Sequence, residues 1–289
     1  MKIGVLGSGF GVYGYLPAAF SLDWNVATLS RYQESIESRP ELTQFQNRIE
    51  YVSSEDILLS YCSSIVLART PDLQFQFLKK YSQELKEMKH LFLEKPLTSS
   101  IEDSEHILEF LGNSELSFSL GYLFLHTEWF EAISQILATN GNKIEIHWSI
   151  PSPKSSWKAS VDLGGGIDSF FLIHFIPVFL KLGFRMSSLK VSQLDKISFL
   201  SVLDLNVIEV YAKLEESDFR FEIFLNDFPA PIYSDETPFG AKPKKGVADP
   251  RISSLQKYLR SSITNSDGGS NALKVELEVL EFLRLRKGQ

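Results

Sequence analysis

Apolar and polar positions in the first 120 residues follow two alternating patterns. Short apolar runs of the kind that forms buried strands are followed by segments in which apolar residues recur at helical spacing. Strands that alternate with helices are typical of a parallel sheet with crossover helices. We therefore expect a doubly wound α/β domain over residues 1–120. Its expected strands are Lys2–Leu6, Asn25–Leu29, residues 64–71 and His90–Leu93, with a helix at residues 73–87.

The pattern changes after residue 120. Apolar and polar residues alternate one by one in several segments, which predicts strands with one buried face. A long apolar segment at 166–182 predicts a helix that packs on these strands. We therefore expect a second α/β domain, residues 121–289, with an open, largely antiparallel sheet. Its expected strands are residues 142–150, 207–214 and 219–225.

Two further segments of the second domain have distinct patterns. Residues 233–250 are rich in proline and glycine and predict an irregular excursion. Such a loop either closes over a substrate or is a mobile surface loop, and the sequence leaves both interpretations open. The amphipathic segment 271–285 predicts a last helix that packs back on the rest of the chain, including the first domain.

Composition and charge narrow the function classes. Of the 289 residues, 44% are hydrophobic and 22% are charged, which is typical of a globular protein. The net charge of −7 argues against nucleic acid as a partner, because phosphate binding requires a basic face. The single cysteine, Cys62, excludes an internal disulfide and a cysteine-rich metal site, and it fits the reducing cytoplasm. No spacing of histidines and carboxylates predicts a metal site.

Neither a targeting segment nor a membrane span is expected. The segment Met1–Gly7 lacks the long apolar core and the cleavage site of a signal peptide. The most apolar run, residues 170–184, is short and contains a histidine, a proline and a lysine. We interpret this run as a buried helix, because a membrane span requires about 20 predominantly apolar residues.

A glycine-rich turn follows the first expected strand. A turn that leads from a strand into a helix brings backbone N–H groups and the positive helix end toward a pyrophosphate. In the usual spacing G-x-G-x-x-G, the first two glycines are Gly7 and Gly9, whereas the third position is Val12. A tight structural turn gives a similar pattern, but the place after an N-terminal strand favours a nicotinamide dinucleotide site. Its expected residues are Gly7, Ser8, Gly9, Phe10 and Gly11.

The end of the second expected strand bears on the choice of cofactor. A dinucleotide-binding fold commonly has an acidic residue there when it binds NAD. This chain has Ser30 and Arg31 instead. A hydroxyl followed by a guanidinium suits a 2′-phosphate, which favours NADP over NAD. The alternative is an exposed arginine that opens a helix.

Further polar residues follow the other expected strands. Because the carboxyl ends of parallel strands meet at one edge of a sheet, where ligands bind, these residues are also candidates for cofactor binding. Lys95 precedes a proline that restricts its backbone, so it is either a solvated boundary residue or a positioned functional group. The candidates are Arg69, Thr70, Pro71, Glu94 and Lys95.

Taken in order, the glycine turn, Thr70-Pro71 and Glu94-Lys95-Pro96 resemble the Gfo/Idh/MocA family of NAD(P)-dependent oxidoreductases. The resemblance extends to Gly164-Gly165-Gly166, followed by His174. It implies an N-terminal Rossmann domain and a C-terminal domain that binds a sugar, sugar nucleotide or polyol-like small molecule. It also implies hydride transfer, with Lys95 and His174 near the reacting oxygen, and leaves room for a homo-oligomer through the C-terminal sheet.

The chain departs from the family pattern near His174. The position of the family aspartate holds Phe170, and Asp168 lies two residues earlier, about 200° away around a helix. We expect Lys95 to move the proton and His174 to position the substrate oxygen, although His174 also fits a core histidine. Three interpretations stay open: an oxidoreductase, a binding or sensing protein that keeps the cofactor fold, and a lyase or hydrolase that cycles a bound cofactor.

Overall fold

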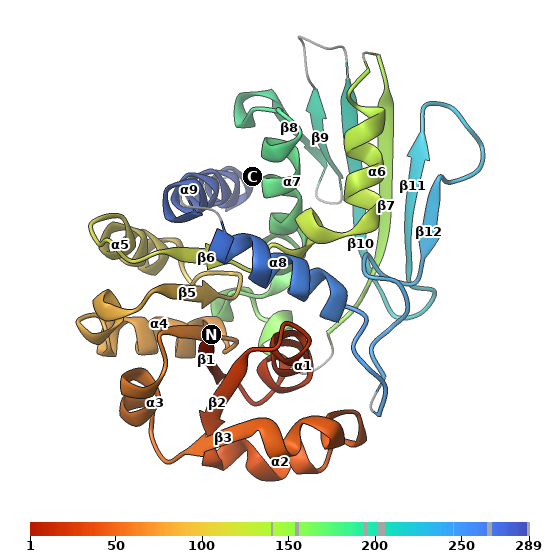
Figure 1. Cartoon of the computed structure of the whole chain (residues 1–289). Coiled ribbons are helices and arrows are strands. Elements are labelled where there is room, and N and C mark those ends of the chain that lie inside the picture. The colour runs from red at the N-terminus through yellow and green to blue at the C-terminus, as the bar shows by residue number, and fades with distance from the viewer. Residues whose placement is uncertain are drawn as a thin grey trace. The chain divides into compact units, whose positions relative to one another are not determined.

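The computed structural model describes residues 1–139, 141–153, 156–193, 196–200, 206–244, 246–264 and 268–287 (Figure 1). The chain divides into two compact units. The first consists of Met1–Leu123 and Pro243–Glu276, and the second of Phe124–Lys242 and Leu277–Gln289. The expected boundary after residue 120 lies three residues before the observed one. Residues 243–276, which we expected in the second domain, belong to the first unit.

Six parallel strands form the sheet of the first unit, in the order β3-β2-β1-β4-β5-β6. This is the strand order of the dinucleotide-binding Rossmann fold. Four strands lie at or within the expected segments, whereas β3 and β6 were not predicted. The strands are β1 (Lys2–Leu6), β2 (Asn25–Leu29), β3 (Ile49–Val52), β4 (Ser64–Leu67), β5 (His90–Leu93) and β6 (Phe118–Leu120).

Helices of the first unit begin where the chain supplies a start signal. The helix α4 begins with Pro71, whose fixed φ suits a first turn. The helix α5 is capped by Ser100, whose Oγ accepts a hydrogen bond from the Asp103 N–H at 3.0 Å. The expected helix at residues 73–87 is α4 followed by a separate 3-10 turn, Glu84–Glu87. The helices are α1 (Leu16–Phe20), α2 (Gln33–Glu37), α3 (Glu55–Tyr61), α4 (Pro71–Lys80), α5 (Ile101–Gly112) and α8 (Ile252–Thr264).

The second unit has a mixed six-stranded sheet in the order β12-β11-β7-β10-β9-β8. Among the described strand pairs of this sheet, only β7 and β10 are parallel, so the sheet is largely antiparallel, as predicted. The first residues of the expected irregular segment form the short strand β12. The strands are β7 (Lys143–Pro151), β8 (Leu189–Gln193), β9 (Lys196–Leu200), β10 (Val207–Glu215), β11 (Arg220–Leu225) and β12 (Tyr233–Asp235).

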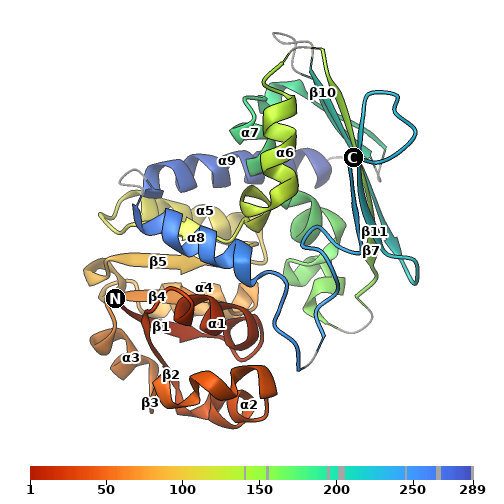
Figure 2. The same ribbon diagram turned by 45° about the vertical axis from the view of Figure 1, so that its right-hand side comes forward.

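One face of this sheet is covered by helices. Figure 2 shows α6 (Glu128–Ile136) and α7 (Phe175–Lys181) on the same side of it. The alternation along β7 explains the packing, since every second residue from Ile144 to Ile150 is buried while the residues between them are half-buried. The last helix, α9 (Gly268–Lys287), belongs to the first unit up to Glu276 and to the second unit thereafter.

The expected long helix at 166–182 is a helical run of changing type. Residues 167–171 are π-helical, residues 172–174 form a 3-10 turn, and the regular helix α7 begins only at Phe175. This start lies two residues before Pro177, and proline is tolerated only in the first turn of a helix. By length and composition alone, the stretch Val161–Lys181 could cross a membrane. More than half of its apolar window is buried in the protein, which agrees with a core helix.

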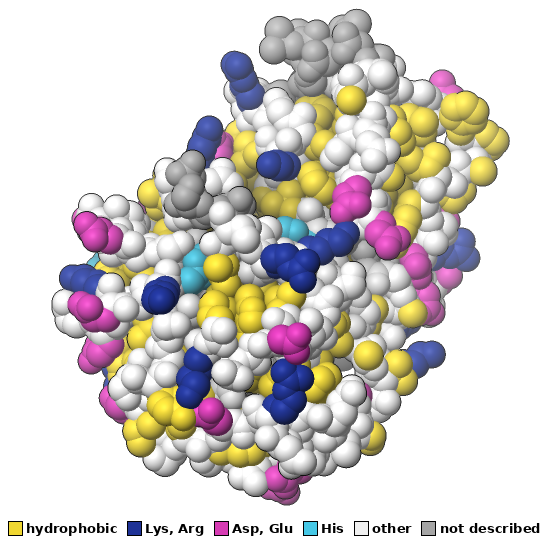
Figure 3. Space-filling view, in the orientation of Figure 1, with side chains coloured by type: hydrophobic (Ala, Val, Ile, Leu, Met, Phe, Trp, Pro, Cys, Tyr) yellow, Lys and Arg dark blue, Asp and Glu magenta, His cyan; other side chains and the backbone are white. Residues whose placement is uncertain are grey.

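Positive and negative side chains are interspersed on the face drawn in Figure 3. The mixture on this face agrees with the net charge of −7.

The buried carboxyl group of Glu276 connects α9 with Tyr122, which follows the strand β6. The hydroxyl of Tyr122 donates a hydrogen bond of 2.5 Å to Oε2 of Glu276, and both side chains are buried. Burial raises the pKa of Glu276 to about 7, and the hydrogen bond from Tyr122 opposes this rise. The carboxyl group is therefore protonated in the folded protein at pH values at which it is ionised in the unfolded chain.

We predict that Glu276→Gln stabilises the protein in a pH-dependent way. The carboxyl group of Glu276 binds its proton more tightly in the folded protein than in the unfolded chain. The folded protein therefore loses stability as the pH rises from about 4.5 to about 7. A neutral amide lacks this loss. The stability of the variant relative to the original protein should therefore grow by up to roughly 3 kcal/mol across that window. Urea unfolding at pH 5 and pH 8 measures the difference.

The exposed Glu281 on the same helix supplies the control. Glu281→Gln should leave the pH dependence unchanged. The same relative stability of Glu276→Gln at both pH values would contradict the role assigned to burial.

Candidate functional site

The glycine turn after β1 passes very close to the end of β4. A Cβ atom on Gly7 would lie 2.1 Å from the carbonyl oxygen of Ala68, and the φ of Gly7 is +143°. The N–H of Ala68 donates a hydrogen bond of 2.7 Å to the carbonyl of Leu6. Only glycine fits this approach. The turn is thereby held at the carboxyl edge of the sheet.

The middle of the turn is open. A Cβ atom on Gly9 would meet no atom within 4 Å. The carbonyl of Gly9 accepts hydrogen bonds from the N–H groups of Val12 and Tyr13 at 2.9 and 3.2 Å, so the chain enters its helix there. The protein's own packing therefore does not require glycine at this position. Open space at a strand-to-helix turn fits the approach of a dinucleotide pyrophosphate.

The ring of Phe10 packs within the turn. A Cβ atom on Gly14 would lie 2.3 Å from a ring atom of Phe10, so Gly14 lets this ring lie against the backbone. The guanidinium of Arg251 also lies over the ring of Phe10, with its Cζ 4.2 Å from the ring centroid. Asp249 holds Arg251 with bonds of 2.8 and 2.7 Å. No motif in the sequence indicates this basic group beside the turn.

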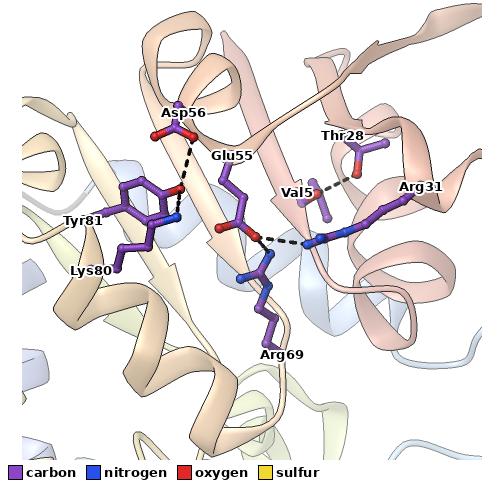
Figure 4. A network of polar contacts seen from close by, with 8 residues as sticks. All are labelled: Val5, Thr28, Arg31, Glu55, Asp56, Arg69, Lys80 and Tyr81. Carbon is purple, nitrogen blue, oxygen red and sulfur yellow. Dashed lines mark hydrogen bonds and ion pairs between the residues drawn. The ribbon is translucent and has the colours of Figure 1, made fainter.

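The residues expected to bind the adenosine ribose have partners of their own. The hydroxyl of Ser30 donates to the carbonyl of Val52 at 3.0 Å. Arg31 and Arg69 both donate to Oε1 of Glu55, at 3.0 and 2.5 Å (Figure 4). The structure thus brings Arg31 and Arg69 together, as their place at one edge predicted, around a carboxylate that we did not predict.

The two arginines lower the pKa of Glu55. Burial alone would raise the pKa of Glu55, but the hydrogen bonds and charges of Arg69 and Arg31 outweigh it and hold the pKa below its ordinary value. Glu55 is therefore a carboxylate at neutral pH.

The loop that carries Lys95 is held by Gln74. The side-chain amide of Gln74, which is fully buried, donates to the carbonyls of Glu94 and Leu97 at 2.8 Å each. Its oxygen accepts from the N–H of Glu94 at 3.0 Å. One side chain of α4 therefore fixes the backbone on both sides of Lys95 and Pro96. Nothing in the sequence around Gln74 signals this role.

The side chain of Glu94 is held by Tyr15 of the first unit. The hydroxyl of Tyr15 donates to Oε1 of Glu94 at 2.5 Å. A Cβ atom on Gly121 would lie 3.0 Å from the same oxygen, so glycine leaves room for the pair. Burial raises the pKa of Glu94, while Tyr15 and the charge of Lys95 oppose the rise. Lys95, the next residue, is 7% exposed, and the peptide bond between Lys95 and Pro96 is cis.

Each of the three consecutive glycines in the second unit has a structural reason. Gly164 and Gly166 have φ values of +80° and +87°. A Cβ atom on Gly165 would lie 2.4 Å from the carbonyl oxygen of Trp157. The turn therefore packs directly against the backbone of residues 157–158.

The positions after this turn are aromatic. His174 is buried and stacks on Phe124, with ring centroids 4.4 Å apart and an angle of 17° between the planes. Phe170 occupies the position of the family aspartate. Its ring centroid lies 5.1 Å from that of Trp157, and the amine of Lys158 lies 4.7 Å from the Phe170 centroid.

Asp168 forms an ion pair with Arg286 of α9. Its Oδ1 accepts a hydrogen bond of 2.7 Å from Nε of Arg286, which is 4% exposed. Burial raises the pKa of Asp168 and Arg286 opposes the rise. The pair connects the helical run with α9 inside the second unit. Within the described part of the chain, no three His, Cys, Asp or Glu side chains gather in a metal-binding arrangement.

We predict that Gln74→Leu loosens the loop of Lys95. The substitution leaves one buried N–H and two carbonyls without their amide partner, which costs about 2–4 kcal/mol. Urea unfolding measures the loss, and hydrogen exchange should show faster exchange of the Glu94 amide.

The matched control is Gln76→Leu, because Gln76 lies on the exposed side of the same helix and bonds only to Asp72 among the described contacts. Equal losses in the two variants would argue against the role of Gln74.

Solved structures match this fold along almost the full chain. A myo-inositol dehydrogenase from Corynebacterium glutamicum ATCC 13032 has a TM-score of 0.66 at 16% identity, with 98% of this chain and 94% of that chain covered. A 3-ketoreductase from Actinomadura kijaniata, in complex with NADP and TDP-benzene, has a TM-score of 0.65 at 15% identity, with 99% and 97% covered. A super-repressor mutant of Gal80p from Saccharomyces cerevisiae has a TM-score of 0.66 at 11% identity, with 100% and 94% covered.

The sequence itself matches no family model and no curated protein sequence. At these identities the likeness establishes the fold. The chain therefore has the two-domain α/β fold of these solved proteins, which is the fold that the resemblance of its motifs implied.

Proposed function

We propose that this protein is a nicotinamide-dependent oxidoreductase of the Gfo/Idh/MocA family. It transfers a hydride between the cofactor and a sugar, sugar nucleotide or polyol-like small molecule. The observation that carries the proposal lies within the first unit. A glycine turn that is open at Gly9 and a firmly held loop with Lys95 follow strands of one parallel sheet. The solved dehydrogenase and ketoreductase of the same fold support the reaction class.

The cofactor would supply the hydride acceptor or donor, and residues of the first unit would hold it. The backbone N–H groups of the turn suit its pyrophosphate, and Arg31 suits a 2′-phosphate. NADP is the preferred form and NAD the alternative. The loops around Thr70 and Glu94 follow β4 and β5, the strands next to β1, and belong to the same edge.

Lys95 would carry the proton of the substrate hydroxyl, and His174 would position the substrate oxygen. Lys95 suits this role because it is nearly buried, on a backbone that Gln74 fixes. A desolvated lysine amine can act as a general base. His174 suits positioning because its ring plane is held by Phe124.

The cellular setting is part of the proposal. We place the protein in the cytoplasm, with a small molecule as its partner and without nucleic acid or membrane. The sheet of the second unit is the proposed surface for a homo-oligomer, since its other face carries side chains such as Lys143, Glu145 and Tyr211 that are only half-buried.

A second candidate is a binding or sensing protein. The apolar ring of Phe170 at the family aspartate position favours it. A repressor protein of yeast with the same fold supports this alternative. The two candidates share the cofactor site and differ in turnover.

Two glycine substitutions separate cofactor binding from folding. Gly9→Val should lower the affinity for NADP and NAD at least about tenfold, because the new side chain occupies the open space. It should leave the fold intact, since no atom lies within 4 Å of the new Cβ. Titration calorimetry and thermal unfolding measure the two effects. If Gly9→Val binds both cofactors normally, the turn is structural only.

Gly7→Ala is the contrasting variant. Its Cβ would overlap with the carbonyl of Ala68, so we expect a loss of stability of about 3 kcal/mol or more.

Substitution of Lys95 tests the enzyme against the binding protein. A search by mass spectrometry for the small molecule that copurifies with the protein would identify the substrate. Lys95→Met should then reduce turnover at least about 100-fold while cofactor affinity stays unchanged. His174→Ala should raise KM as well as lower kcat. Turnover that survives in Lys95→Met would show that another group carries the proton.

A further inference from the structure

A carboxylate lies between the two arginines at the adenosine end of the proposed site. Oε1 of Glu55, the first residue of α3, accepts hydrogen bonds from both Arg31 and Arg69 (Figure 4). The three groups together carry one net positive charge. Neither the sequence motifs nor the proposed function assigns a role to Glu55.

The two arginines are held differently. The Arg69 side chain is 9% exposed, lies 5.2 Å from the ring centroid of Phe77 and approaches Glu55 to 2.5 Å. The Arg31 side chain is 61% exposed and its distance to Glu55 is 3.0 Å. An exposed ion pair is weak and its members reorient readily, whereas a buried guanidinium that loses its carboxylate is left unpaired. Arg69 therefore keeps Glu55, and Arg31 is the group that can turn to a ligand.

We infer that Glu55 is a selectivity residue, an internal counter-ion that competes with the 2′-phosphate of NADP for Arg31. The inference rests on the proposed dinucleotide site. A 2′-phosphate that reaches Arg31 must replace the contact with Glu55 and lie beside its negative charge. A 2′-hydroxyl meets neither obstacle. Glu55 thus lowers the affinity for NADP relative to NAD, so that the same site accepts both cofactors.

The variant Glu55→Gln tests this role directly. It keeps the shape of the side chain and removes the charge. We expect the Kd of NADP to fall about tenfold, the size of one charge contact near a protein surface, while the Kd of NAD changes by less than about twofold. Titration calorimetry with both oxidised cofactors measures the ratio of the two constants. The gain should shrink at high salt, because added ions screen the phosphate from the charges.

Two further variants make the result specific. Glu50→Gln changes the net charge equally on the neighbouring strand β3, where Glu50 pairs with Lys2 at 3.1 Å, and should leave the ratio unchanged. The double variant Glu55→Gln, Arg31→Ala should lose the gain for NADP, since Arg31 is the exposed arginine of the pair and Arg69 is nearly buried.

Each outcome decides a separate point. An unchanged ratio in Glu55→Gln, with NAD still bound, would overturn the role of Glu55 and leave the proposed function intact. An equal gain in Glu50→Gln would show a general charge effect and overturn it as well. Failure of the original protein to bind either cofactor would overturn the proposed function and this inference together.

Discussion

The first unit depends on the close approach of Gly7 to the end of β4. The carbonyl of Ala68 lies where a side chain at position 7 would begin, so β1 and β4 can be neighbours only because that side chain is absent. This contact brings the two central strands to one level at their carboxyl ends. The segments that follow β1 and β4 then share an edge, and the segment that follows β5 joins them by pairing with β4. A steric constraint at one residue thus assembles the candidate site.

The loops on this edge are held by different forces. Gln74 fixes the loop of Lys95 with hydrogen bonds from a buried amide, which are directional and costly to break. Arg31 is an exposed side chain that pairs with the half-buried Glu55, and such a contact at the surface is weaker and more adjustable. The contrast follows the proposed tasks. Proton transfer requires a group at a fixed position, whereas recognition of a charged ribose tolerates a side chain that changes partner.

The sequence predicted the elements of the first unit more fully than their contacts. Buried parallel strands are continuous apolar runs, so β1, β2, β4 and β5 were recognisable, whereas the short edge strands β3 and β6 were not. The edge of the sheet gathered the expected cofactor residues because parallel topology requires it. The partners Glu55, Gln74 and Arg251 escaped prediction, since each acts on residues distant in the sequence. In the second unit, the apolar run at 166–182 predicted a helix, but its irregular start depends on local backbone geometry that the apolar pattern does not encode.

The aromatic surroundings of His174 bear on the role that we propose for this residue. A carboxylate beside a histidine fixes its tautomer and stabilises the charged imidazolium, which suits proton transfer. Here the imidazole lies flat on Phe124, and the nearby family aspartate position is Phe170. Stacking fixes the plane of the ring but supplies no negative charge for a transferred proton. Such a histidine can direct a hydrogen bond toward an oxygen without becoming the base. In the proposed reaction the proton goes to Lys95, on the loop that the amide of Gln74 holds.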